Sequence, residues 1–345
     1  MNAITTRIAN KLLLKKVLTR LIFGLSTFGR SMSSTGGLTI SPVSKYLIGT
    51  CPFGTTPAGD ESTLALRPRC ITRSPHLNPP GHTLPTDHIY FYFADPNIGE
   101  SPVARRTDLF APADGTVLFV IDNGVGSDRK IGFRGTSKVT YYVDHLIPTV
   151  SLAVGTAVKA GDRLGTTGSA YGIDLGVVND DVMLTGLVNL SRYPKGEEHT
   201  DAPLKYYAEP LRSQLYAKVL RIGPDLDGKF DFDIAGRLSG NWFGESDQAP
   251  LAFAYDTYDP TLVRIATSSG LALAPSVFGI ASGDREPRDI SVASGAVVYT
   301  ITRTGAPSGR MLVQMLSDDR IRVEIFTPAT ASVTGFTGAA KVFVR

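Results

Sequence analysis

The stretch Val154-Gly-Thr-Ala-Val-Lys-Ala-Gly-Asp-Arg-Leu-Gly165 decides the fold class, because glycines recur in it at short intervals. Only five residues separate its first two glycines and three separate the last two. Such spacing is typical of short strands joined by tight turns. Long helices are excluded here, since glycine is one of the poorest helix formers. The stretch therefore predicts compact β structure.

Further strands are predicted upstream of this stretch. Three segments are rich in β-branched and aromatic residues, which favour strands: Ile89–Phe93, Phe110–Val120 and Lys138–Val143. Residues 203–221 are the best helical candidate, but Pro210 lies inside them, so any helix there is expected to be broken. The region from about 85 to 180 is therefore predicted to be a β domain.

A second β region follows. Residues Asp319–Phe326 alternate strictly between apolar and charged types, which predicts a strand with one buried face made of Ile321, Val323 and Ile325. Together with Met311–Leu316 this strand forms a predicted hairpin. The only tryptophan, Trp242, is interpreted as a core residue that opens this region.

We therefore predict a mainly β protein with two β domains. The first is a barrel-sandwich or duplicated-hybrid-like domain, and the second is an antiparallel barrel or sandwich. The predicted boundaries are a leader over 1–50, a first domain over 51–222 with a Pro-rich beginning and a helical connector at its end, and a second domain over 223–345. Composition agrees, because 42% hydrophobic and 19% charged residues exclude a disordered chain.

Charge is concentrated at the N-terminus. Seven basic residues and no acidic one precede Asp60, and the remaining chain has 28 basic against 32 acidic residues, a formal charge of −4. A nucleic-acid partner is therefore not predicted. The basic segment with its short apolar run Leu21–Leu25 favours export to the cell envelope or outside, with organellar import as the alternative. No apolar run reaches the roughly 20 residues of a membrane span, so no transmembrane span is predicted.

The only two cysteines, Cys51 and Cys70, lie in the Pro- and Gly-rich segment that precedes the first predicted strand. In an exported protein, two such cysteines are natural partners for a disulfide bond. We therefore expect a Cys51–Cys70 disulfide.

Histidines supply the candidate chemistry. His82 and His88 lie six residues apart, Asp87 directly precedes His88, and His145 follows the strand-like segment that begins at Tyr141. Imidazole and carboxylate groups are common ligands of zinc. These residues therefore form the candidate site.

Over about residues 80–180 the chain resembles lysostaphin-type (LytM-like) zinc metallopeptidases. The resemblance is carried by Ala-Pro-Ala-Asp-Gly-Thr-Val at 111–117, by the Tyr-x-x-x-His-Leu pattern at 141–146 and by the hairpin at 154–168. It implies a β fold with a zinc site in which a histidine, an aspartate four positions later and the second histidine of a His-x-His motif bind the metal.

Two of those three ligands are absent. The resemblance places His88 at the first-ligand position, yet Tyr92 stands where the aspartate is expected. The closing motif reads Gly172-Ile-Asp-Leu-Gly176, so Asp174 replaces one histidine and Gly176 replaces the metal ligand. Glycine has no side chain with which to coordinate an ion.

Two interpretations stay open. In the first, zinc is held by an altered set: the metal ligands are His82, Asp87 and His88, and the catalytic residues are His145 and Asp174. In the second, the histidines belong to a structural network in which Asp87 or Asp144 accepts their hydrogen bonds. Neighbours on a strand point to opposite faces, so Asp87 and His88 could both reach one ion only in a turn.

The preferred prediction is a non-catalytic, peptidase-like binding or regulatory module that needs no cofactor. We expect it to recognise peptide or glycan of the cell envelope through four amphipathic rings: Tyr90, Tyr92, Tyr141 and Tyr142. The alternative is a zinc metallohydrolase of the peptidoglycan endopeptidase type with altered ligands. An architectural secreted protein is the third interpretation, and the sequence does not predict an oligomeric state.

Overall fold

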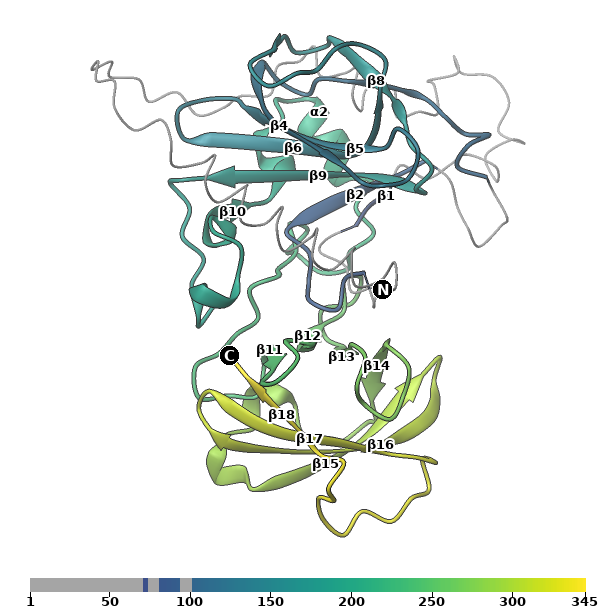
Figure 1. The fold of residues 1–345 in the computed structure, drawn as a ribbon, viewed down its shortest axis with the longest axis vertical. Helices are drawn as coiled ribbons and strands as arrows, with labels where there is room; N and C mark the ends of the chain where they lie inside the picture. Colours follow the sequence, from purple (N-terminus) through teal and green to yellow (C-terminus); the bar gives the residue numbers. More distant parts are fainter. Residues whose placement is uncertain (1–70, 74–80, 94–100) are drawn as a thin grey trace, which may run out of the picture.

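Two bodies of antiparallel strands make up the protein (Figure 1). The structure, a computed structural model, describes residues 71–73, 81–93 and 101–345. One body is a ten-stranded sheet and the other is a closed barrel of eight strands. The predicted mainly β fold with two β domains is confirmed, and the second domain is a barrel rather than a sandwich.

The sheet body has the main strand order β1-β2-β9-β6-β5-β4-β7, and β3, β8 and β10 pair beside it. Its strands are β1 (Ile71–Arg73), β2 (His88–Tyr92), β3 (Asp108–Phe110), β4 (Gly115–Asp122), β5 (Arg129–Arg134), β6 (Val139–Pro148), β7 (Ala157–Val158), β8 (Arg163–Thr167), β9 (Gly172–Asn179) and β10 (Thr200–Asp201). Gly155 and Gly161 have φ angles of 90° and 88°, so both serve as the turn residues that their spacing predicts.

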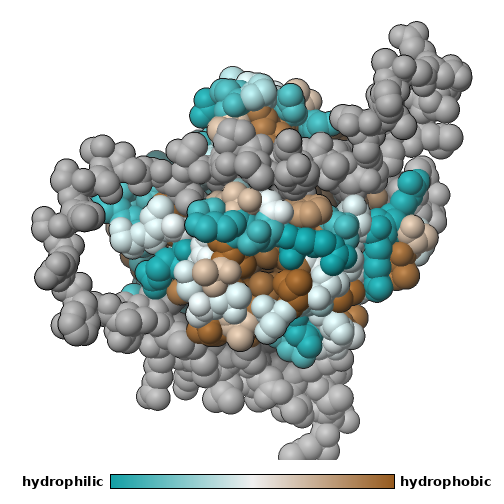
Figure 2. Space-filling view, turned by 90° about the horizontal axis from the view of Figure 1, so that it is seen from above, coloured by the Kyte–Doolittle hydropathy of each residue, from teal (hydrophilic) through white to brown (hydrophobic). Residues whose placement is uncertain are grey.

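One face of this sheet packs against the main hydrophobic core. Ile89 and Phe91 of β2 and Ile173 and Leu175 of β9 are buried in that core. Because side chains alternate along a strand, the residues between them project from the opposite face. That opposite face carries the candidate site. Seen from above, the sheet body shows hydrophobic residues gathered between strips of hydrophilic ones (Figure 2).

Short helical segments cover the core face. A 3-10 turn at Pro203–Tyr206 and the helix α2 (Leu211–Tyr216) contribute Leu204, Leu211 and Leu215 to the core. The predicted break is present, because Pro210 separates the two segments. Shorter 3-10 turns lie at Leu190–Arg192, Glu197–His199, Pro287–Asp289 and Val292–Ser294.

The barrel is a closed ring in which β18 pairs back with β11. Its strands are β11 (Gly240–Gly244), β12 (Pro250–Tyr255), β13 (Val263–Thr267), β14 (Ser276–Ile280), β15 (Ala296–Arg303), β16 (Ala306–Ser317), β17 (Arg320–Phe326) and β18 (Lys341–Val344). Trp242 lies fully buried in the barrel core, as predicted. Ile321, Val323 and Ile325 point inward, which also agrees with the prediction.

One residue of β17 departs from the predicted alternation. Glu324 was expected on the solvent side, but it is buried. Its carboxylate accepts hydrogen bonds from the backbone N–H and the hydroxyl of Thr337, in the long loop before β18. This loop covers the outer face of the strand, so the charged side chain is satisfied without solvent.

The segment between β9 and β11 connects the two bodies. Asp233, which precedes β11, accepts hydrogen bonds from the backbone N–H of Val188 and the hydroxyl of Tyr193, each at 2.9 Å. Arg221, which belongs to the connecting segment, donates hydrogen bonds to the backbone oxygens of Asp256 and Thr257, just after β12 of the barrel. Apolar contacts add to these, since Leu84 packs against Ala252 and Ala254 of the barrel, and the contacts between the bodies are therefore both polar and apolar.

Several predictions concern residues outside the described part of the chain. They are the leader over 1–50 and the disulfide between Cys51 and Cys70, and both stay predictions, as do the domain boundaries. None of the helices within the described residues is both long enough and apolar enough to cross a membrane.

Candidate functional site

Three neighbouring strands place a row of polar side chains on the face opposite the core. His88 of β2 and Tyr142 of β6 are both paired with Gly176 of the strand β9 between them. One step along the strands, Asp174 is paired with Tyr90 on one side and Asp144 on the other. The register alone thus gathers histidine, tyrosine and aspartate side chains in two adjacent rows.

His88 lies between two carboxylates. Its Nδ1 is 2.8 Å from Oδ1 of Asp87, and its Nε2 is 3.2 Å from Oδ2 of Asp174. The imidazole is only 7% exposed. Burial opposes a charged ring, but hydrogen bonding and charge from Asp174 and Asp87 outweigh it and raise the pKa of His88 to about 9. The ring is therefore protonated at neutral pH. Its Nδ1 is hydrogen-bonded to Asp87, whereas its Nε2 pairs with Asp174 through charge and has no well-formed hydrogen bond.

Asp87 and His88 do come together, although they are neighbours in the sequence. His88 is the first residue of β2, whereas Asp87 still belongs to the preceding turn, so its carboxylate folds back to the ring. Burial alone would raise the pKa of Asp87, yet the hydrogen bond and the charge of His88 hold it below the ordinary value. The turn that the sequence required for such a contact is present.

Tyr142 reaches across β9 to the same pair. Its hydroxyl donates to Oδ1 of Asp87 at 2.9 Å and lies 3.0 Å from Nδ1 of His88. The ammonium of Lys130 lies 3.6 Å from the centre of the ring. Burial, followed by the charges of Asp87 and Asp174, raises the pKa of Tyr142 well above its ordinary value, so the hydroxyl remains a donor.

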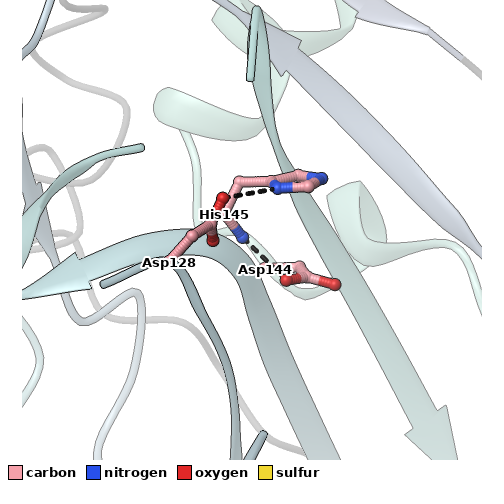
Figure 3. A group of neighbouring side chains, drawn as sticks. All are labelled: Asp128, Asp144 and His145. Carbon is pink, nitrogen blue, oxygen red and sulfur yellow. Dashed lines mark hydrogen bonds and ion pairs between the residues drawn. The ribbon is translucent and has the colours of Figure 1, made fainter. Parts of the chain in front are cut away.

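A β-bulge aims His145 toward the site. Arg129 pairs with Leu146 and Ile131 with Val143, so two residues of β6 oppose one residue of β5. His145 sits in this bulge with a φ of 63°, in the left-handed region that most residues avoid. Its Nδ1 lies 3.1 Å from Oδ2 of Asp128. Figure 3 shows the ring directed toward that carboxylate.

The other nitrogen of His145 faces the shared aspartate. Nε2 lies 3.7 Å from Oδ2 of Asp174, the same oxygen that faces His88. Burial opposes a charge on this ring as well, but Asp128, Asp174 and Asp144 raise the pKa of His145 to about 9. Its side chain is 32% exposed, so it is the more accessible of the two imidazoles.

Asp174 is thus the centre of the network. Its side chain is only 5% exposed, and burial alone would raise its pKa. The neighbouring rings of His88 and His145 lower it below the ordinary value instead. The second oxygen, Oδ1, is buried and has no hydrogen-bond partner among the described residues.

One group of possible metal ligands is compact. Asp128, Asp144 and His145 have ligand atoms within 4.8 Å of one another, the only such group among the described residues (Figure 3). However, the amide nitrogen of Asn123 donates to Asp128 at 3.0 Å and to Asp144 at 2.7 Å. Asp144 also accepts the backbone N–H of His145. Both carboxylates of this group therefore already accept hydrogen bonds from donors of the protein.

The aromatic residues separate into two sets. The ring of Tyr90 stacks on that of Tyr92, with centroids 5.8 Å apart, on the face of the site. His82 lies beside them, with its ring 5.6 Å from that of His88. Burial and then the charge of His88 lower the pKa of His82, which is therefore neutral at pH 7.

Tyr141 must be removed from the predicted ligand surface. It is buried in the core, stacked on Phe133, and its hydroxyl donates to the backbone oxygen of Ala113. The reason is strand alternation, because Tyr141 and Tyr142 are neighbours on β6 and project from opposite faces.

The residues present do not fit the zinc set that the sequence resemblance implies. Both nitrogens of the first-ligand residue His88 face carboxylates, and the position of the third ligand is Gly176. In the described part of the chain, the ligand atoms of the altered set His82, Asp87 and His88 do not gather within 4.8 Å. What these residues form is a chain of carboxylate–imidazole pairs.

The sequence analysis did not identify two residues that contribute to this network of side chains. Asp128 and Asn123 lie in the loop between β4 and β5, which carries Gly124 and Gly126 and reads as an ordinary turn. Asp87 or Asp144 was expected to accept from the ring of His145, but Asp128 takes that role. Only the register of β5 against β6, with its bulge, brings Asp128 to the ring.

Comparisons with known proteins give matches among solved structures alone, since no family model and no curated protein matches the chain. A variant of the catalytic domain of the prophage-encoded M23 protein EnpA from Enterococcus faecalis is 17% identical, over 32% of this chain and 80% of that one, with a TM-score of 0.24. LytU is 17% identical, over 44% and 90%, with a TM-score of 0.29. The antimicrobial peptidase lysostaphin from Staphylococcus simulans is 11% identical, over 79% and 86%, with a TM-score of 0.27. The last of these structures is a peptidase of the lysostaphin type that residues 80–180 resemble in sequence.

Proposed function

We propose that the sheet body is a non-catalytic binding module with a peptidase-like fold that recognises peptide or glycan of the cell envelope. The observation that carries the proposal is the unbroken series Asp87–His88–Asp174–His145–Asp128, in which every imidazole nitrogen faces a carboxylate. The acid-free basic leader supports export to the envelope, with organellar import as the alternative.

Catalysis is disfavoured by the protonation states of this series. A general base must be unprotonated near the working pH, and an effective one has a pKa close to it. His88 and His145 have pKa values raised to about 9, so both rings are protonated on both nitrogens and positively charged at pH 7. The carboxylates that could replace them are engaged in ion pairs with the same rings.

Binding is favoured by what remains accessible. The imidazolium of His145 is a partly exposed hydrogen-bond donor, and the carboxylate of Asp87, 28% exposed, is an acceptor. The half-buried ring of Tyr92 lies on the same face, stacked on the buried ring of Tyr90. Peptide backbones and sugars both present donors and acceptors, and sugar rings also pack on aromatic faces.

The test is retention on isolated cell-wall material. We expect the parent protein to be retained and His145→Ala to be retained several-fold less. The matched control is Lys138→Ala, which removes an exposed charge just before the other end of β6. Circular dichroism establishes that each variant is folded. Retention of the parent no better than that of an unrelated protein would defeat the proposal and leave the architectural interpretation.

Metal content tests the rival zinc hydrolase. Elemental mass spectrometry of protein purified without a metal-affinity tag is expected to find no stoichiometric zinc after zinc is added and the excess removed. About one zinc per chain, lost in the double variant His88→Ala/His145→Ala, would instead establish the enzyme interpretation.

A further inference from the structure

Gly176 has no room for a side chain. A Cβ atom at this position would lie 2.2 Å from Cε1, 2.3 Å from Cζ and 2.6 Å from the hydroxyl oxygen of Tyr142. The backbone does not require glycine, because Gly176 is not among the residues with positive φ. Space is therefore what restricts position 176, and the ring of Tyr142 fills that space.

The ring of Tyr142 is fixed on several sides. It is buried, Lys130 lies over one face, and the ring of His88 meets it edge-on with centroids 6.1 Å apart. The hydroxyl is tied to Asp87 and His88. The far end of this side chain therefore cannot swing away from Gly176 without breaking its hydrogen bond to the partly buried Asp87–His88 ion pair.

The contact crosses three strands. Tyr142 on β6 and His88 on β2 do not pair directly, since β9 lies between them and pairs with both. The hydroxyl passes over the bare backbone of Gly176 and closes the gap. A metal ion bound by residues of these strands would connect them in a similar way.

We infer that Tyr142 and Gly176 are an interlocked pair that replaces a metal centre: the hydroxyl links β2 to β6, and the ring excludes a third ligand from position 176. The inference rests on the non-catalytic function proposed above and deepens it. It implies that a ligand restored at position 176 alone cannot rebuild a zinc site, because the tyrosine ring must leave first.

A double-mutant cycle tests the interlock. Gly176→Ala in the parent is expected to lower the midpoint of thermal unfolding of the sheet body by about 5 °C or more, since overpacking is destabilising. In a Tyr142→Ala background the same change is expected to have little effect. Equal effects of Gly176→Ala in the two backgrounds would overturn the inference, whether or not the wall-binding experiment succeeds.

A zinc-binding measurement is the second test of the inference. The measurement is made in a Tyr92→Asp background, which restores the other missing ligand. There Gly176→His alone is expected to retain no zinc, whereas Tyr142→Ala/Gly176→His is expected to hold about one zinc per chain. Zinc on Gly176→His with Tyr142 in place, or a folded Tyr142→Ala/Gly176→His variant of that background without zinc, would overturn the claim that the ring excludes the metal. If the Tyr142→Ala/Gly176→His variant does not fold, the double-mutant cycle of Gly176→Ala and Tyr142→Ala still tests the interlocked pair. If the double-mutant cycle and the zinc measurement both give the expected result but the protein does not bind cell-wall material, only the proposed function is refuted.

Discussion

Asp174 is the residue whose loss should weaken the sheet body most selectively, because one of its oxygens faces both His88 and His145. The substitution Asp174→Asn keeps the shape of the side chain and removes the charge. It leaves His88 with Asp87 as its only carboxylate partner. The expected result is a loss of stability that depends on pH in a defined direction.

The size of the effect follows from the pKa of His88. A rise from 6.5 to about 9 corresponds to roughly 3 kcal/mol of stabilisation, at about 1.4 kcal/mol for each pH unit. Asp174 is the larger contributor to this rise and must also offset burial, so we expect Asp174→Asn to cost about 2–4 kcal/mol at pH 6. Because the folded pKa is raised, this stabilisation is complete below pH 6.5 and is lost as the pH rises through about 9. At pH 10 a difference of no more than about 1 kcal/mol should remain.

Urea unfolding followed by circular dichroism at pH 6 and pH 10 measures the difference between parent and variant. The only tryptophan, Trp242, lies in the barrel, so its fluorescence supplies an internal control that should not change. A loss of equal size at both pH values would show that packing and not charge is responsible. No loss at pH 6 would refute the ion-pair network itself.

Three further changes have defined outcomes. Tyr142→Phe removes a hydrogen bond to the charged Asp87 and should lower the unfolding free energy by about 1.5–3 kcal/mol, measured by urea unfolding at pH 7. Trp242→Ala should destabilise the barrel by about 3–5 kcal/mol, seen as faster hydrogen exchange of barrel amides while amides of the sheet body keep their rates. Glu324→Ala leaves the N–H of Thr337 without its acceptor, so that amide should exchange faster; an unchanged rate would mean that the loop is held by other contacts.

Most of the fold was predictable because its signals are local. Turn glycines, β-rich segments and the alternation in Asp319–Phe326 report on backbone geometry that neighbouring residues determine. Glu324 shows where local reasoning fails. Its burial depends on Thr337, which is distant from the strand pattern and reaches it through a loop.

The site was predictable in its residue types and not in its pairings. A turn was the one arrangement in which Asp87 and His88 could meet, and Asp87 does lie in the turn before β2, 2.8 Å from the ring of His88. The partner of the His145 ring was not predictable, because a one-residue bulge between β5 and β6 determines that Asp128 faces it. Tyr141 was placed on the wrong face, although strand alternation relative to Tyr142 already contained the answer.

Residue types alone cannot distinguish a catalytic site from a structural network here, because both use histidines and aspartates on one face of a sheet. The difference lies in the partners of each ring. A catalytic imidazole needs one nitrogen directed at substrate, metal or water and a pKa near the working pH. In this protein both nitrogens of His88 face carboxylates, and Tyr142 covers the backbone at Gly176, where a further ligand would start. The same carboxylates that could take part in catalysis hold the rings protonated, so these rings could act as bases only after the network had been taken apart.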